Sequence, residues 1–154
     1  MMKPSIKIFL FLLLFIWTTG ILSASILSAS NLHYIPLVKK IFAPVCHQQL
    51  YKTIIIEGNA LIVCARCSGI YFGGLVSSFI LFFLMKDFLP SIKVLFIAAL
   101  PMLLDVILYS SGFYEYNKII SFLTGFLFGS AALFYIYVGL IDFFVELKLK
   151  RKET

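Results

Sequence analysis

The stretch VCARCSGIYFGG, residues 63–74, places two cysteines and an arginine directly before a run of apolar and small residues. No formally charged residue follows Arg66 until Lys86. Because a helix needs about 20 apolar residues to cross roughly 30 Å of hydrocarbon, we interpret this stretch as the start of a transmembrane helix. Its first turn then carries Cys64 and Cys67, whose C-x-x-C spacing is typical of metal sites, redox pairs and disulfides.

The composition extends this interpretation to the whole chain. Of the 154 residues, 62% are hydrophobic and 13% are charged, which is about half the charged fraction of a typical soluble domain. We predict an all-α fold, an integral membrane bundle of four transmembrane helices in a single domain over residues 1–154. The predicted spans, each with at most one charge, lie at about 6–27, 67–85, 94–113 and 119–141.

Basic residues set the predicted orientation. A cluster of four, within residues 148–152, follows the last span, and Lys3 and Lys7 flank the first. Because Lys and Arg beside spans favour the cytoplasmic side, both termini are predicted to be cytoplasmic, in a multi-pass protein of the cell membrane. The net charge of +6 then indicates membrane topology and not nucleic-acid binding. Small residues in ILSASILSAS, 21–30, leave open that the first span is a cleaved signal peptide.

Residues 28–66, between the first two spans, are predicted to form a short extracytoplasmic cap. Within them, YIPLVKKIFAPV, residues 34–45, predicts a short amphipathic helix at the membrane interface. A turn at residues 57–59 separates two short apolar runs, which either pair as a hairpin or pass through the interface.

Glycine pairs occur in two of the predicted spans. Gly69 and Gly73 lie in the second span, and Gly125 and Gly129 lie in the fourth. Both pairs have the G-x-x-x-G spacing, which lets helix backbones approach closely. We expect these glycines to mark tight packing within the bundle.

The predicted topology brings the chemically versatile side chains to the extracytoplasmic side of the membrane. Three thiolates and one imidazole suit a tetrahedral site for a transition metal, with zinc as the default ion. The predicted ligands are Cys46, His47, Cys64 and Cys67. A further ligand, or a residue that supports the ligands, is predicted among Asp105, Arg66 and Asn117.

The same thiols permit two other interpretations. A helix N-terminus and Arg66 both favour a reactive thiolate at Cys64 or Cys67. A four-helix membrane protein with an outward C-x-x-C resembles the vitamin K epoxide reductase type of disulfide-generating enzymes. Those enzymes typically relay electrons through a second cysteine pair to a quinone, for which this chain offers only Cys46. The third interpretation is a structural disulfide, or packed thiols without chemistry, in a structural membrane protein.

Three other residues have alternative interpretations as well. Asp105 lies about 18 Å along the third predicted span, and a carboxylate inside a span tends to mark function. Its alternative role is to pack helices together by binding Arg66, Lys118 or a buried hydroxyl. Arg66 could orient the site or contact lipid headgroups, and His33 is predicted to be an interfacial residue and not a ligand.

Two cysteine motifs resemble those of a known family. CHQ at 46–48 and CARCSGIYFG at 64–73, with Gly58 between them, resemble the predicted membrane proteins grouped as domain of unknown function 2085 (DUF2085). The later part of the family pattern matches at Pro101, Asp105, Asn117 and Thr124-Gly125. Two places depart from it: Lys52-Thr53, where Arg-Ser is usual, and Ser121, where the family has an arginine.

This resemblance covers about residues 40–130. It implies that one site groups Cys46, His47, Cys64, Cys67 and Asp105, without implying a reaction. We therefore predict a small integral membrane protein with an outward-facing Cys/His cluster that binds a transition metal. The lipid bilayer is the predicted partner, and nucleic acid is not. The sequence leaves open whether the protein is an enzyme, and whether it associates with itself or with other proteins.

Overall fold

The structure is a computed structural model of the chain and describes residues 4–26, 35–56, 58–83 and 91–153. The described part is mostly helical. In chain order its elements are α1 (Pro4–Ile26), α2 (Ile35–Phe42), the 3-10 helix η1 (Leu50–Lys52), β1 (Thr53–Ile56), β2 (Asn59–Cys64), α3 (Ala65–Phe83), α4 (Ile92–Ser110) and α5 (Lys118–Glu153).

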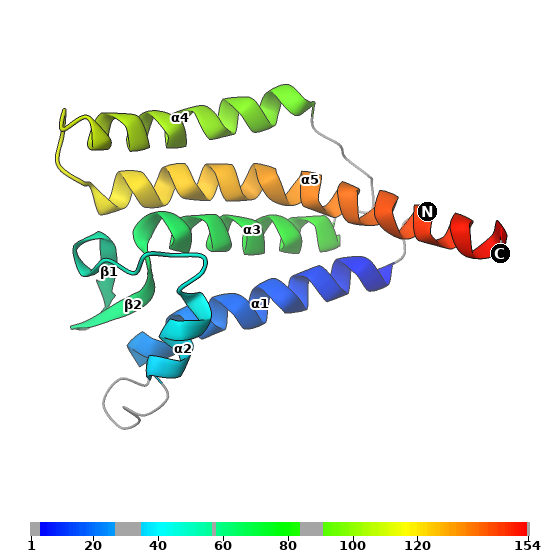
Figure 1. Cartoon of the computed structure of the whole chain (residues 1–154), viewed down its shortest axis with the longest axis horizontal. Coiled ribbons are helices and arrows are strands. Elements are labelled where there is room, and N and C mark those ends of the chain that lie inside the picture. Colours follow the sequence, from blue (N-terminus) through cyan, green and yellow to red (C-terminus); the bar gives the residue numbers. More distant parts are fainter. Residues whose placement is uncertain (1–3, 27–34, 57, 84–90, 154) are drawn as a thin grey trace.

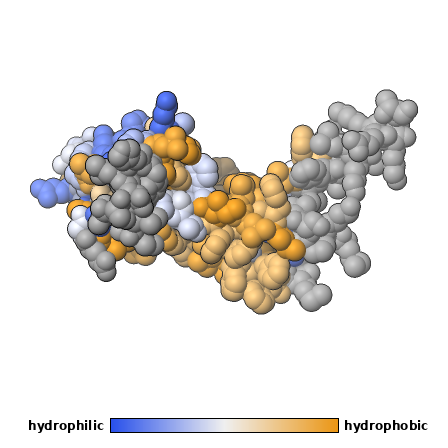
Figure 2. All heavy atoms as spheres, turned by 90° about the horizontal axis from the view of Figure 1, so that it is seen from below, coloured by the Kyte–Doolittle hydropathy of each residue, from blue (hydrophilic) through white to orange (hydrophobic). Residues whose placement is uncertain are grey.

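The four long helices lie side by side, with α5 between α3 and α4 and with α1 beyond α3 (Figure 1). The short elements α2, η1, β1 and β2 form a cap at one end of the bundle, where α3 and α5 begin and α4 ends. Figure 2 shows hydrophobic residues gathered over the helices and hydrophilic residues gathered at the cap end. This division is expected of a helical bundle in a bilayer with its polar end in water.

Within the residues that the structure describes, three helices are long and apolar enough to cross a membrane: α3, α4 and the Lys118–Leu140 part of α5. They agree with three of the predicted spans to within a few residues, although α5 continues as a helix to Glu153. The described apolar part of α1, Lys7–Ser23, is shorter than a full span. The prediction of four spans is therefore not confirmed.

The contact between α3 and α5 is built on glycine. A Cβ at Gly69 would overlap the carbonyl oxygen of Phe122, and a Cβ at Gly125 would overlap the carbonyl oxygen of Arg66. Gly73 and Gly129 lie equally close to the backbone of the other helix. Only a residue without a side chain permits such an approach, so the predicted tight packing at the G-x-x-x-G pairs is confirmed.

The cap contains a two-stranded antiparallel hairpin, which corrects the all-α prediction. Strands β1 and β2 pair with Thr53 opposite Cys64 and Ile56 opposite Asn59. Gly58 turns the chain between them with a φ of 82°, a conformation that L side chains rarely adopt. The two apolar runs therefore pair with each other, which was one of the two predicted alternatives.

An apolar core holds the cap onto the end of the bundle. It joins residues of α1, α2 and β2 with the first cysteine: Ile21, Phe42, Cys46, Leu61, Ile62 and Val63. The predicted amphipathic helix exists as α2, whose Val38 packs on this core while Leu37 and Ile41 are exposed. The position of α2 at the membrane interface stays a prediction, and His33 lies outside the described residues.

Candidate metal centre

Three sulfur atoms meet where the cap joins the bundle. The Sγ atoms of Cys46, Cys64 and Cys67 all lie within 4.8 Å of one another, and no disulfide joins them. They come from the loop after α2, from the last residue of β2 and from the first turn of α3. Antiparallel pairing with β1 and the α2 packing bring Cys46 back to the C-x-x-C pair, 18 residues further along the chain.

Backbone N–H groups point at the first of these sulfurs. Gln48 and Cys64 donate to Cys46 Sγ over 3.4 Å and 3.2 Å, and Gln48 itself has a left-handed φ of 52°. Such donors stabilise a thiolate and not a thiol. The chain after Cys46 is therefore bent in a way that suits a negatively charged sulfur.

Hydrogen bonds among the sulfurs act in the same direction. The thiols of Cys64 and Cys67 donate to Cys46 and, with the backbone donors, lower the pKa of Cys46 to about 2. The pKa of Cys64 is raised, chiefly because its proton is held by Cys46. Among the three sulfurs, Cys46 is therefore the one whose surroundings most favour the thiolate. A metal ion would displace the remaining thiol protons and bind three thiolates.

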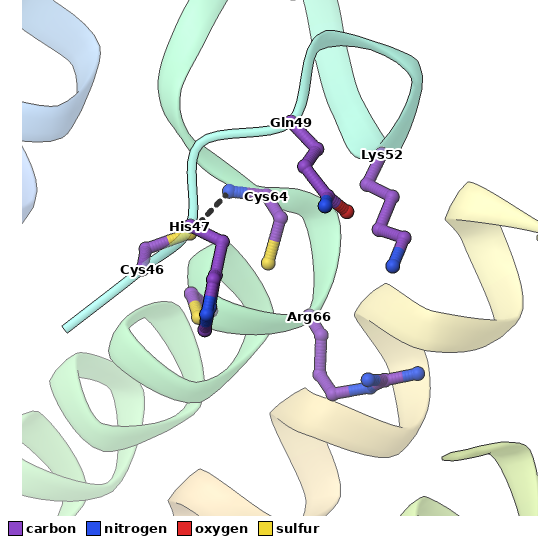
Figure 3. A pocket seen from close by; sticks show the side chains of 7 residues that line it. Cys46, His47, Gln49, Lys52, Cys64 and Arg66 are labelled. Atoms are coloured by element: carbon purple, nitrogen blue, oxygen red, sulfur yellow. Dashed lines mark hydrogen bonds between the residues drawn. The ribbon is translucent and has the colours of Figure 1, made fainter. Parts of the chain in front are cut away.

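A hollow of about 350 Å³ opens beside the sulfurs (Figure 3). Its lining residues come from the cap and from the start of α3: Cys46, His47, Gln49, Lys52, Cys64, Arg66 and Cys67. His47 is exposed and lines this hollow, but in the part of the chain that the structure describes, the group of mutually close ligand atoms contains only the three sulfurs. The structure therefore brings three of the four predicted ligands together and leaves His47 on the wall of the hollow.

The Asp105 carboxylate lies in a separate polar junction. It is 4% exposed, forms an ion pair with Arg66, and accepts hydrogen bonds from Tyr114 and, over 2.8 Å, from Ser121. These partners belong to α3, to the loop after α4 and to α5. Asp105 therefore joins helices through Arg66 and a buried hydroxyl, as its alternative interpretation predicted, and it contacts the cysteines only indirectly.

Arg66 and Asn117, the other two residues singled out, also have defined partners. Arg66 stands between Cys64 and Cys67 in the chain and points to Asp105, so the ion pair ties the C-x-x-C turn to α4. Asn117 Oδ1 accepts the backbone N–H groups of Ile119 and Ile120 over 2.9 Å and 3.2 Å, which caps the start of α5. Neither side chain belongs to the sulfur group.

A cage of aromatic rings, which the sequence did not predict, surrounds Lys52. The Nζ atom lies 5.2 Å from the ring centre of Tyr51, 4.7 Å from that of Tyr109 and 5.7 Å from that of Tyr116. The hydroxyls of Tyr51 and Tyr109 are 3.1 Å apart. These rings come from η1, from the end of α4 and from the loop before α5. Only the adjacent Tyr51-Lys52 pair was visible as a local signal.

The cysteines and the Asp105 junction lie in a part of the chain that matches a protein family. The family described as predicted membrane protein (DUF2085) matches residues 46–135, which is more than half of the 154-residue chain. The chain belongs to this family. The DUF2085 match contains the three cysteines, the Lys52 cage and the Asp105 junction, whereas α1 and α2 lie before it.

One curated protein extends the comparison. An uncharacterized protein from Methanocaldococcus jannaschii is 38% identical to this DUF2085 protein over 99 residues, which are 62% of this chain and 64% of that protein. The chain thus spans a little less than two thirds of the length of that relative. No solved structure matches the chain.

Proposed function

We propose that this membrane protein binds a transition metal ion, zinc by default, through Cys46, Cys64 and Cys67. The observation that carries the proposal is the meeting of three sulfurs within 4.8 Å of one another. In a tetrahedral site with Zn–S bonds of about 2.3 Å, two sulfurs lie ~3.7 Å apart. The sulfurs therefore need only a small contraction to hold one ion.

The donor set supports zinc over harder ions. Thiolates select soft or borderline metals, whereas Mg²⁺ and Ca²⁺ prefer carboxylate and carbonyl oxygens. The N–H groups of Gln48 and Cys64 that point at Cys46 support its role as a thiolate ligand. His47, on the wall of the hollow, is the protein's own candidate for the fourth ligand.

The Asp105–Arg66 ion pair would support this site from the membrane side. Arg66 is held by a carboxylate of α4, so the turn that carries Cys64 and Cys67 has a fixed position on the bundle. We further propose that the cap faces the outside of the cell membrane, with both termini in the cytoplasm. The basic cluster after the last span supports this orientation.

Metal analysis of the purified protein tests the proposal. Protein prepared in detergent under reducing, chelator-free conditions should carry about one ion per chain, because three thiolates and one further ligand complete a single site. The Cys64→Ser variant should lose the ion, whereas Ala60→Ser on the same strand should keep it. Protein without metal but with an exchangeable Cys64–Cys67 disulfide would favour the thiol-disulfide oxidoreductase instead. Protein with neither, in which Cys64→Ser changes only stability, would favour a structural role.

A further inference from the structure

The hollow beside the sulfurs is lined by hydrogen-bond donors. Apart from the cysteines, every side chain that lines it presents nitrogen: His47, Gln49, Lys52 and Arg66. No carboxylate is among its lining residues, as far as the described chain extends. In Figure 3 the side chains of Gln49 and Lys52 reach from the cap toward Arg66, and Cys64 lies beside Gln49. Such a lining suits a ligand that carries acceptor oxygens.

Lys52 supplies a positive charge in this hollow that no carboxylate of the described lining offsets. The charge of Arg66 is balanced by Asp105, and that ion pair does not include Lys52. Three tyrosine rings hold the Lys52 ammonium 4.7–5.7 Å from their centres, which stabilises the cation and fixes its place without cancelling its charge. A fixed ammonium needs less ordering to bind an anion than a free surface lysine does.

In the metal-loaded protein Lys52 would also offset the net charge of the site. A divalent ion with three thiolates has a net charge of −1, which would repel an incoming anion. The Lys52 ammonium offsets that charge, so the loaded hollow is neutral overall. A volume of about 350 Å³ corresponds to roughly ten water molecules, which is room for a small anion and part of its hydration shell.

We propose that this hollow binds a small oxyanion or carboxylate, with Lys52 as its charged contact and Gln49 and His47 as hydrogen-bond donors. In the metal-loaded protein an oxygen of the same anion, and not the His47 imidazole, takes the fourth coordination position, a part of the inference that rests on the proposed function. The anion is either a free solute or the phosphate of a lipid headgroup, because both present the same acceptor oxygens.

Equilibrium dialysis of inorganic phosphate and acetate against the reduced protein in a nonionic detergent tests the anion site with or without metal. Wild type should bind at least one of them saturably. Lys52→Gln should bind about tenfold more weakly or worse, since it removes a charge-assisted contact. Lys52→Arg should restore binding, and Lys118→Gln, a lysine outside the hollow, should match wild type. No saturable binding of either anion, or equal binding by wild type and a folded Lys52→Gln, would overturn the proposal.

Loading with Co²⁺ separates this inference from the proposed function. Thiolate-to-cobalt charge-transfer absorption reports metal at the cysteines, and its absence would refute the metal site while the dialysis still decides the anion site. Added phosphate should shift the d–d bands if its oxygen bonds the metal. Bands that respond to His47→Ala but not to phosphate would refute that part of the inference and assign the fourth position to His47. Competitive displacement of bound phosphate in detergent by a short-chain phosphatidylglycerol, but not by a diacylglycerol with the same chains and no phosphate, would identify the lipid headgroup as the occupant.

Discussion

Substituting Gly125 by alanine tests how closely the candidate site depends on the contact between α3 and α5. The added Cβ would overlap the carbonyl oxygen of Arg66 and lie 3.2 Å from its carbonyl carbon. Backbone cannot yield as a flexible side chain does, so the two helices must move apart. Arg66 lies between Cys64 and Cys67 in the chain, so the same displacement moves two of the three sulfurs.

The expected magnitude follows from a comparison within one helix. Gly139 also lies in α5, but a Cβ there meets nothing within 4 Å. Both Gly→Ala changes gain about 1 kcal/mol of helix propensity, so their difference isolates the steric cost. Overpacking of this kind costs about 1–3 kcal/mol. We expect Gly125→Ala to be less stable than Gly139→Ala by that amount, and to bind metal about tenfold more weakly or worse because the sulfurs shift.

Unfolding by sodium dodecyl sulfate in dodecyl maltoside micelles measures the difference in stability. The single tryptophan, Trp17, reports on the cap core because its ring centre lies 4.6 Å from that of Phe42. Metal affinity is measured on the same samples by competition with a chelator. A Gly125→Ala protein that is as stable as Gly139→Ala, with unchanged metal affinity, would refute the close contact between Gly125 and Arg66.

Three other outcomes follow from the polar groups. Asp105→Asn should lower the free energy of unfolding by about 3 kcal/mol in the same assay, because it leaves the largely buried Arg66 guanidinium without a counter-charge. An unchanged free energy of unfolding would contradict the buried ion pair. Tyr114→Phe should lower the free energy of unfolding by about 1–2 kcal/mol, because it removes one donor from the Asp105 carboxylate. If Tyr114→Phe lowers the free energy of unfolding by the same amount in a protein that already carries Asp105→Asn, the result would argue against that hydrogen bond. The pKa of Cys46 falls from 9.0 in the unfolded chain to about 2 in the folded protein. The Cys46 thiolate therefore stabilises the metal-free fold fully above pH 9, and this stabilisation is lost as the pH falls toward 2. Thiolate ultraviolet absorbance at neutral pH should therefore be present in the reduced wild type and absent in Cys46→Ser.

Local composition was enough to predict the helices that carry the fold. A segment such as 94–113 has one charge and must satisfy its backbone internally in lipid, so its helical state does not depend on its neighbours. The role of the glycines of α3 and α5 could also be predicted from the sequence, because the G-x-x-x-G spacing allows close packing wherever two helices meet. The C-x-x-C spacing identified two of the three sulfurs for a similar reason, since its geometry lies within one turn of chain.

Only the tertiary structure decided which distant groups become partners. Asp105 pairs with Arg66, 39 residues earlier in the chain, and not with the cysteines, because α3 and α4 both pack on α5 and this packing brings the two side chains within reach of each other. Lys52 acquires a cage from rings up to 64 residues away (Lys52 to Tyr116), which no local periodicity encodes. The choice between a hairpin and a passage through the interface was likewise made in the fold, where β1 pairs with β2 and Val63 of β2 packs in the cap core. The sequence alone thus determined the long helices and the cysteine thiols. Tertiary packing determined which side chains lie next to each of them, because the surroundings of a side chain depend on segments that are distant along the chain.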